Sequence, residues 1–181
     1  MPRAHISTLT VFCGSRTGND PSLETLTANL GNMLAEKQIR LVYGGGSIGL
    51  MGILARAQMK AGGHVTGIIP DFLDALEVGE RNITDFVRVT SMHERKALMA
   101  EEADAFLVLP GGIGTLDELV EILTWRQLAL HEKPVFLLDH AGYWQPFVTL
   151  LEHIYDRGFI GPETLTHIEV LPDLAALMHK V

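Results

Sequence analysis

The feature that most constrains this chain is the regular alternation of short apolar runs with longer stretches that carry apolar residues at helical spacing. Strands and helices that alternate in this way form a parallel sheet with helices packed on both faces. The predicted strands are residues 7–13, 39–43, 64–69, 86–89, 105–109, 135–138 and 168–171. The sequence therefore predicts an α/β fold of three layers with a mainly parallel β-sheet between the helices.

Helices are expected between these strands, and residues 70–84 are the one long interval without a helical pattern. We expect that interval to be an irregular loop over the site. No internal repeat, low-complexity segment or linker interrupts the pattern, so residues 1–181 are expected to form a single domain. Predicted helices cover residues 50–61 and 143–157, follow Asp20-Pro21, and begin near Ser91, Thr115 and Asp173.

The net charge of -8 and the isoelectric point near 5.4 argue against binding to nucleic acid or to an anionic membrane surface. No apolar run is long enough to span a bilayer, and residues 9–13 are too short for a signal peptide. The single cysteine, Cys13, allows no internal disulfide and is typical of a reducing compartment. These features predict a cytoplasmic protein.

The segment 107–118 combines an apolar strand, Pro110, three glycines and the start of a helix. Glycines let the backbone turn tightly and approach a ligand, and a helix N-terminus offers free N–H groups to an anion. A phosphate group is therefore the expected ligand. No lysine follows the last glycine, which argues against a nucleoside triphosphate hydrolase. The spacing of Thr115 and Glu118 also matches a helix-capping box, so capping and catalysis both remain open for Glu118.

A second glycine loop, residues 44–49, follows another predicted strand and matches the dinucleotide fingerprint. The chain leaves little room for a substrate domain, so a mononucleotide that contacts both glycine loops accounts for more residues. The same loop matches the G-x-S-x-G element of serine hydrolases, with Asp139 and His167 as remote candidates for the other triad members. We regard that activity as a minor alternative.

Residues 91–96 contain a predicted capping box, Ser91 to Glu94, followed by Arg95 and Lys96 in the first turns of a helix. Cations at that end oppose the helix dipole, so their presence in an acidic chain favours anion binding over a purely solvated pair. The eight histidines include no pair at the four-residue spacing of a metal site. We therefore predict no metal site and no cofactor.

The segments 44–52, 92–96 and 110–118 together resemble the Lonely Guy (LOG) family of cytokinin riboside 5′-monophosphate phosphoribohydrolases, once described as possible lysine decarboxylases. The similarity extends from Val11 to Ile160. It implies a Rossmann-like domain, a homodimer and a nucleoside monophosphate as the small-molecule partner. The implied reaction is hydrolysis of the N-glycosidic bond of an adenine-type nucleotide, which releases the base and ribose 5-phosphate.

The resemblance also implies roles for individual residues. Arg95 and Glu118 match the two catalytic positions of the family. The implied substrate-binding residues are Gly14, Ser15, Gly45, Gly46, Glu77, Met92, Lys96, Pro110, Gly111, Gly112, Ile113, Gly114, Thr115 and Thr124. By chemistry, Glu118 is the candidate to stabilise an oxocarbenium-like transition state or to orient water, and Arg95 the candidate for electrostatic positioning.

Two other functions compete with this hydrolase. The first is a nucleotide-binding or sensing protein of the same fold without turnover, against which the presence of both Arg95 and Glu118 counts. The second is decarboxylation with pyridoxal phosphate, which requires a lysine that forms a Schiff base. Lys96 is the one lysine near the predicted site, so that activity is the weakest of the three.

Overall fold

A parallel sheet of seven strands forms the centre of the computed structural model, which describes residues 6–77 and 79–181. The strand order is β4-β3-β2-β1-β5-β6-β7, and every neighbouring pair is parallel. The strands are β1 (Thr8–Phe12), β2 (Arg40–Tyr43), β3 (Val65–Pro70), β4 (Asp85–Val89), β5 (Ala105–Val108), β6 (Val135–Leu138) and β7 (Ile168–Leu171). The predicted three-layer α/β fold is confirmed, and the sheet is fully parallel.

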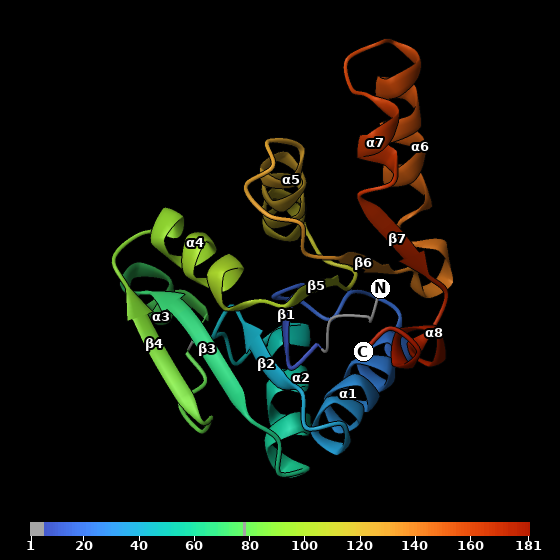
Figure 1. Cartoon of the computed structure of the whole chain (residues 1–181). Helices are drawn as coiled ribbons and strands as arrows, with labels where there is room; N and C mark the ends of the chain where they lie inside the picture. Colours follow the sequence, from blue (N-terminus) through green and yellow to red (C-terminus); the bar gives the residue numbers. More distant parts are fainter. Residues whose placement is uncertain (1–5, 78) are drawn as a thin grey trace.

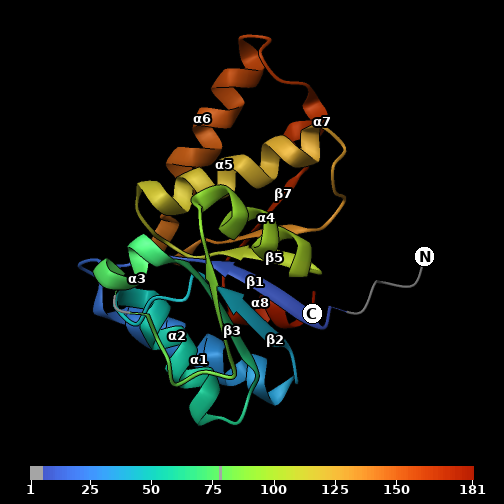
Figure 2. The same ribbon diagram turned by 90° about the vertical axis from the view of Figure 1, so that its left-hand side faces the viewer.

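Helices cover both faces of the sheet, as Figures 1 and 2 show. On one side lie α1 (Pro21–Glu36), α2 (Gly49–Lys60) and α8 (Leu174–Met178). On the other lie α4 (Met92–Glu102), α5 (Ile113–Gln127), α6 (Gln145–Asp156) and α7 (Pro162–Leu165). A short helix, α3 (Asp71–Glu77), follows β3 directly, and a 3₁₀ turn (His140–Gly142) precedes α6.

The alternation of side chains along each strand divides the core into two apolar clusters. Leu9, Val11 and Leu41 pack with α1 and α2 in one cluster. Phe12 and Val42 point the other way and pack with α4 and α5. Because the central strands are buried on both faces, they carry apolar residues at nearly every position, and this explains their uninterrupted hydrophobic runs.

The order of the strands predicts a binding crevice beyond the carboxyl ends of β1 and β5. The chain progresses outward in one direction from β1 through β2, β3 and β4, then returns to β5 on the other side of β1. In open parallel sheets a crevice forms beyond the carboxyl ends of the strands where the order reverses in this way. The loops that follow β1 and β5 meet there, because Gly14 N donates a hydrogen bond to Pro110 O at 3.2 Å.

The prediction that residues 70–84 lack regular structure is wrong at Asp71–Glu77, which is helical. Ion pairs with other elements stabilise this helix: Arg88 of β4 lies 2.7 Å from Asp71, and Arg81 lies 2.6 Å from Asp74. Local hydrophobic periodicity does not reveal contacts of this kind. The segment still reaches the second glycine loop, since Glu80 N donates to Gly45 O at 2.9 Å.

Other boundaries differ by a few residues. Helix α5 begins at Ile113 and not at Thr115, while α6 begins at Gln145 because residues 140–142 form a 3₁₀ turn first. The sequence analysis did not predict α7, a helix of four residues that starts with Pro162. Elements this short have too few residues to show a helical period.

Helices α1 and α2 lie close together at Gly31, where an added methyl group would lie 2.8 Å from Leu54 O and 2.9 Å from the Ala57 side chain. We predict that Gly31→Ala lowers the free energy of unfolding by about 1–3 kcal/mol, although alanine favours helices, because the backbones must separate. Thermal and urea melts measure this change. Asn32→Ala, at the adjacent exposed position of α1, should alter stability by less than about 0.5 kcal/mol.

Candidate active site

The N-terminus of α5 has no side-chain cap. Its N-cap residue is Gly112, which has no side chain to accept a hydrogen bond from the first turn. Methyl groups added at Gly112 or Gly114 would meet nothing within 4 Å, so the space above both residues is open. The backbone N–H groups of the first turn of a helix have no intrahelical partner, and here they face this open space together with the positive end of the helix dipole.

The position of Thr115 decides against the capping box proposed for residues 115–118. Thr115 is the third residue of α5 and lies 4% exposed beneath Gly111, whereas a capping box requires it at the N-cap. Glu118 therefore does not close the helix end. It lies one turn further along, 9% exposed, with Oε1 4.0 Å from Nη1 of Arg95.

Arg95 is 4% exposed, and backbone carbonyl groups hold its guanidinium in place. Nε donates to Ile68 O at 3.1 Å and Nη2 donates to Gly44 O at 2.7 Å. These two acceptors lie in β3 and directly after β2. A side chain at Gly44 would overlap Nη2, which gives a physical reason for glycine there. The remaining nitrogen, Nη1, is the one turned toward Glu118 and Met92.

The predicted capping box at the start of α4 is present in a modified form. Ser91 Oγ accepts a hydrogen bond from Glu94 N at 3.1 Å, as expected. The Glu94 carboxylate binds Thr90 N at 2.8 Å, one residue before the position that a standard box uses. This hydrogen bond and one from the Thr90 hydroxyl lower the pKa of Glu94. Arg95 thus extends inward from the first turns of a well-defined helix.

Lys96 projects to a different side of α4 from Arg95. Its Nζ lies 3.0 Å from Asp117 and 3.0 Å from Glu121 on α5. Burial opposes the charge of Lys96, but the two carboxylates outweigh burial and raise the pKa of the ammonium group. Of the three acidic residues near the glycine loop, Asp117 and Glu121 are thus paired with Lys96, whereas Glu118 lies beside Arg95.

A cavity of about 280 Å³ lies between Arg95, Glu118 and the start of α5; we call it the Arg95–Glu118 cavity. It brings together seven of the predicted site residues with three that were not predicted. The predicted ones are Ser15, Arg95, Gly112, Ile113, Gly114, Thr115 and Glu118. The additional ones are Cys13, Arg16 and Met51. A cation, a carboxylate and a helix N-terminus therefore line one small space.

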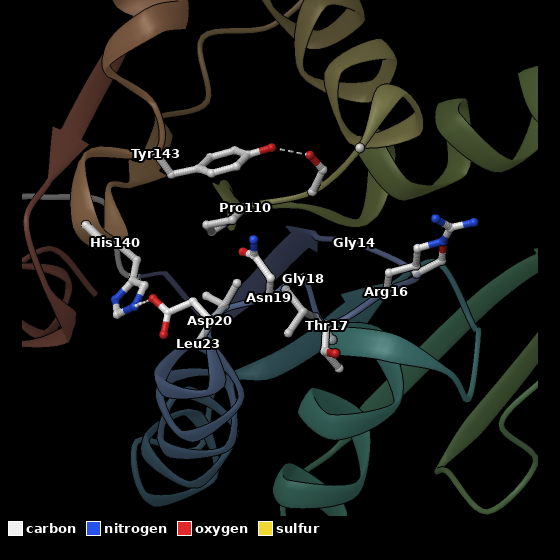
Figure 3. Close-up of a pocket in the computed structure, with 15 residues that line it drawn as sticks. Gly14, Arg16, Thr17, Gly18, Asn19, Asp20, Leu23, Pro110, His140 and Tyr143 are labelled. Atoms are coloured by element: carbon white, nitrogen blue, oxygen red, sulfur yellow. Dashed lines mark hydrogen bonds and ion pairs between the residues drawn. The ribbon is translucent and has the colours of Figure 1, made fainter.

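A second cavity of about 280 Å³ lies on the other side of Gly112; we call it the Tyr143 cavity (Figure 3). Tyr143 Oη donates a hydrogen bond to Gly111 O across it. At its far end His140 Nε2 lies 3.1 Å from Asp20 Oδ2. Hydrogen bonds from Ser22 and the contact with His140 lower the pKa of Asp20. Gly14, Pro110 and Gly111 line this cavity, and Ser15, Arg16 and Gly112 line both.

Besides Lys96, four predicted substrate-binding residues whose side chains are described line neither cavity. Gly45 and Gly46 are buried beneath residues 79–80, and Met92 adjoins Arg95. Thr124 is exposed, further along α5, and donates to Val120 O. Glu77 ends α3, but its side chain lies outside the described residues, so the prediction for it has no structural counterpart.

The structure also decides between the interpretations of the second glycine loop. Leu50 N donates to Gly14 O at 3.1 Å, and a side chain at Gly49 would collide with the backbone of Ser15. The loop after β1 therefore covers the start of α2 and leaves no place for a pyrophosphate. The serine hydrolase triad is excluded as well. Asp139 follows the carboxyl end of β6 and His167 precedes the amino end of β7, so the two residues lie at opposite ends of neighbouring parallel strands.

Two further searches of the described residues bear on the site. Among residues 6–77 and 79–181, no group of three or more histidine, cysteine or acidic side chains is arranged to hold a metal ion. Over the same residues, none of the helices combines the length and the apolar character needed to cross a membrane.

The fold and the cavity define the class of this protein: a parallel α/β protein with a glycine loop at a helix N-terminus beside a buried arginine and glutamate. The family model described as "Possible lysine decarboxylase" matches residues 51–181. Cytokinin riboside 5′-monophosphate phosphoribohydrolase LOG7 of Arabidopsis thaliana is 44% identical over 179 residues, which cover 99% of this chain and 82% of the relative. The chain belongs to this LOG family.

A relative outside plants agrees with this assignment, and a more distant structure shares the fold. The cytokinin riboside 5′-monophosphate phosphoribohydrolase of Rhodococcoides fascians is 44% identical over 167 residues, covering 92% of this chain and 84% of that protein. The molybdenum cofactor carrier protein of Chlamydomonas reinhardtii superposes with a TM-score of 0.70 at 19% identity, over 97% of this chain and 95% of that one. At that identity the likeness shows the shared fold alone.

Sequence analysis overlooked Arg16. The one available signal for a role in the site was its position. It is a cation that shortly follows the first predicted strand of an acidic chain, and ligands bind beyond the carboxyl ends of parallel strands. The Arg95 and Lys96 pair is a stronger signal in the sequence, yet one of that pair contacts backbone carbonyl groups and the other contacts carboxylates.

The glycines of the first loop should differ in what they tolerate. We predict that Gly111→Ala lowers the free energy of unfolding by about 1–3 kcal/mol, because the new methyl group would overlap Thr115. Gly114→Ala, within α5 and facing open space, should leave stability unchanged or raise it by up to about 1 kcal/mol. Chemical denaturation of the two variants measures the contrast, and equal losses would contradict the assignment.

Proposed function

We propose that this chain hydrolyses the N-glycosidic bond of a purine nucleoside 5′-monophosphate with adenine or an N6-substituted adenine as base. The products are the free base and ribose 5-phosphate. The observation that carries the proposal is the buried arrangement of Arg95 and Glu118 one helical turn beyond an uncapped anion-binding loop. The names of the relatives, which are phosphoribohydrolases at 44% identity, support the same reaction.

The spacing along α5 suits the substrate. In this proposal the 5′-phosphate lies over the N–H groups of Ile113, Gly114 and Thr115. Glu118 lies one turn further along, about 5.4 Å by the helix pitch. Phosphate and anomeric carbon are separated by a similar span in a ribose 5-phosphate. The carboxylate of Glu118 is thereby placed beside the anomeric carbon, where positive charge develops as the bond to the base breaks.

Glu118 and Arg95 have complementary parts in this mechanism. The carboxylate stabilises the oxocarbenium-like transition state and orients the attacking water. Two nitrogens of the Arg95 guanidinium donate to carbonyl groups, so Arg95 presents Nη1 to the cavity at a fixed position. It helps to orient Glu118, whose Oε1 lies 4.0 Å from Nη1, and it is available to polarise the ribose or the leaving base.

Decarboxylation with pyridoxal phosphate has less support. The cofactor requires an amine that can lose its proton and attack an aldehyde. Lys96 is held by Asp117 and Glu121, and its pKa is raised. That environment favours the protonated, unreactive form.

A direct assay tests the proposed reaction. The pure protein is incubated with AMP, N6-isopentenyl-AMP and the corresponding nucleosides, and free base and ribose 5-phosphate are measured by chromatography. We expect turnover of the monophosphates and at least about 10²-fold slower turnover of the nucleosides, because the loop binds the phosphate. Binding of the nucleotides without release of base would instead support a non-catalytic sensor.

Glu118→Gln should reduce kcat by about 10² to 10⁴-fold, because the amide carries no charge to stabilise the cation or to activate water. Its melting temperature should stay close to that of the wild type, since the amide has the same shape and the residue does not cap α5. Initial rates and thermal melts are measured together. Glu36→Gln, an exposed change at the end of α1, is the matched control. A variant that loses stability but keeps its activity would contradict the catalytic role.

We also propose that the active form is a homodimer with α5 and α6 at the interface. Val120 and Leu128 on and just after α5 are 50% and 63% exposed, and α6 has no buried residue although it is rich in apolar side chains. In Figure 1, α6 extends away from the sheet, so the sheet cannot cover its apolar side. A two-fold related copy supplies the same surface in return. It also brings the exposed Thr124 beside a partner.

Trp125→Glu should separate the dimer and abolish activity together, because the change places a charge on the apolar α5 surface. Light scattering at micromolar concentration gives the mass, and the assay above gives the rate. Asn29→Glu, an exposed change on α1 at the other face of the sheet, should leave both unchanged. A wild-type protein that is monomeric and fully active would refute the proposed assembly.

A further inference from the structure

Arg16 lies between the two cavities. It follows β1 and lines both the Arg95–Glu118 cavity and the Tyr143 cavity, a position that it shares with Ser15 and Gly112. Figure 3 shows its side chain at the end of the Tyr143 cavity away from His140 and Asp20. Gly112 is the N-cap residue of α5, so Arg16 lines the same two cavities as the N-terminus of that helix.

The backbone that carries Arg16 is held firmly. The adjoining Gly14 donates to Pro110 O at 3.2 Å and accepts from Leu50 N at 3.1 Å. Gly49 packs so closely that a side chain there would collide with the backbone of Ser15 and Arg16. The side chain itself is exposed, and within the described part of the chain it makes no side-chain hydrogen bond or ion pair. An anchored backbone therefore presents a guanidinium group that no other residue has engaged.

The neighbouring cations already have partners, although Nη1 of Arg95 is turned toward Glu118 and the cavity. Arg95 donates to Gly44 O and Ile68 O, and Lys96 is paired with Asp117 and Glu121. A phosphate dianion at the start of α5 would face the nearby Glu118 in a chain of net charge -8. Helix N–H groups supply partial charges only, so this dianion requires a full positive charge from a side chain.

We propose that Arg16 binds the 5′-phosphate of the substrate from the β1 side of the cavity and sets the preference for nucleotides over nucleosides. This inference rests on the proposed phosphoribohydrolase function and adds to it the residue that recognises the phosphate. The guanidinium plane offers two parallel N–H donors, which match two phosphate oxygens, while the N–H groups of α5 bind the phosphate from the opposite side.

The test compares Arg16→Ala and Arg16→Lys with the wild type and with Lys37→Ala, an exposed charge removal at the end of α1. Initial rates give kcat and KM for AMP and adenosine. Calorimetry gives the affinity for ribose 5-phosphate and for ribose. We expect Arg16→Ala to raise KM for AMP and the Kd for ribose 5-phosphate by about 10- to 100-fold, with kcat changed by less than about threefold. Arg16→Lys should recover part of that loss, because it keeps the charge but not the paired donors.

The constants for adenosine and ribose should be the same in all four proteins, and the melting temperature of Arg16→Ala should equal that of the wild type. A wild-type KM for AMP in Arg16→Ala, or an equal loss with AMP and adenosine, would overturn the assignment. Wild-type protein that does not bind ribose 5-phosphate would overturn it too. If the wild type binds ribose 5-phosphate but releases no base, the hydrolase proposal fails, while the change in Kd still decides the role of Arg16.

Discussion

Arg95 carries a positive charge into the interior of this protein, and the carbonyl oxygens of Gly44 and Ile68 make its burial tolerable. A buried charge without hydrogen-bond partners is strongly destabilising, so the position of Arg95 depends on two carbonyl groups at the carboxyl edge of the sheet. Adjacent parallel strands bring those groups together at that edge. The cavity, the orientation of Glu118 and the requirement for glycine at residue 44 all follow from this arrangement.

Arg95 and Lys96 have different roles because they face different sides of α4. Arg95 and Lys96 are adjacent in sequence, yet a helix turns successive side chains by about 100°, so they face different surroundings. One contacts carbonyl groups at the edge of the sheet and the other joins α4 to α5 through Asp117 and Glu121. The ion pairs of Lys96 hold the two helices that carry Arg95 and Glu118 in register. Of these two adjacent cations, Lys96 thus joins two helices and Arg95 lines the cavity.

Patterns within the sequence were sufficient for the sheet and for the glycine loop of α5. Buried strands such as β5 are continuous apolar runs, and a strand followed by glycines and a helix has few other interpretations. The partners of Arg95 could not be predicted, because Gly44 lies 51 residues away and the contact depends on strand order. Helix α3 was missed for a similar reason, since ion pairs with Arg81 and Arg88 stabilise it. The boundary of α5 was missed because glycine is both a loop residue and a tolerated N-cap.

The hydrogen bond from Tyr143 to Gly111 O connects two parts of the molecule that the sheet keeps separate. Tyr143 shortly precedes α6, which extends away from the sheet, and Gly111 directly precedes the N-cap of α5. The tyrosine ring is rigid, so the carbonyl group of Gly111 follows the position of the first turn of α6. The geometry of the glycine loop before α5 is thereby tied to a helix that contributes no side chain to the Arg95–Glu118 cavity. A molecule that packed against the first turn of α6 and shifted it would therefore also shift the glycine loop, through the hydrogen bond of Tyr143.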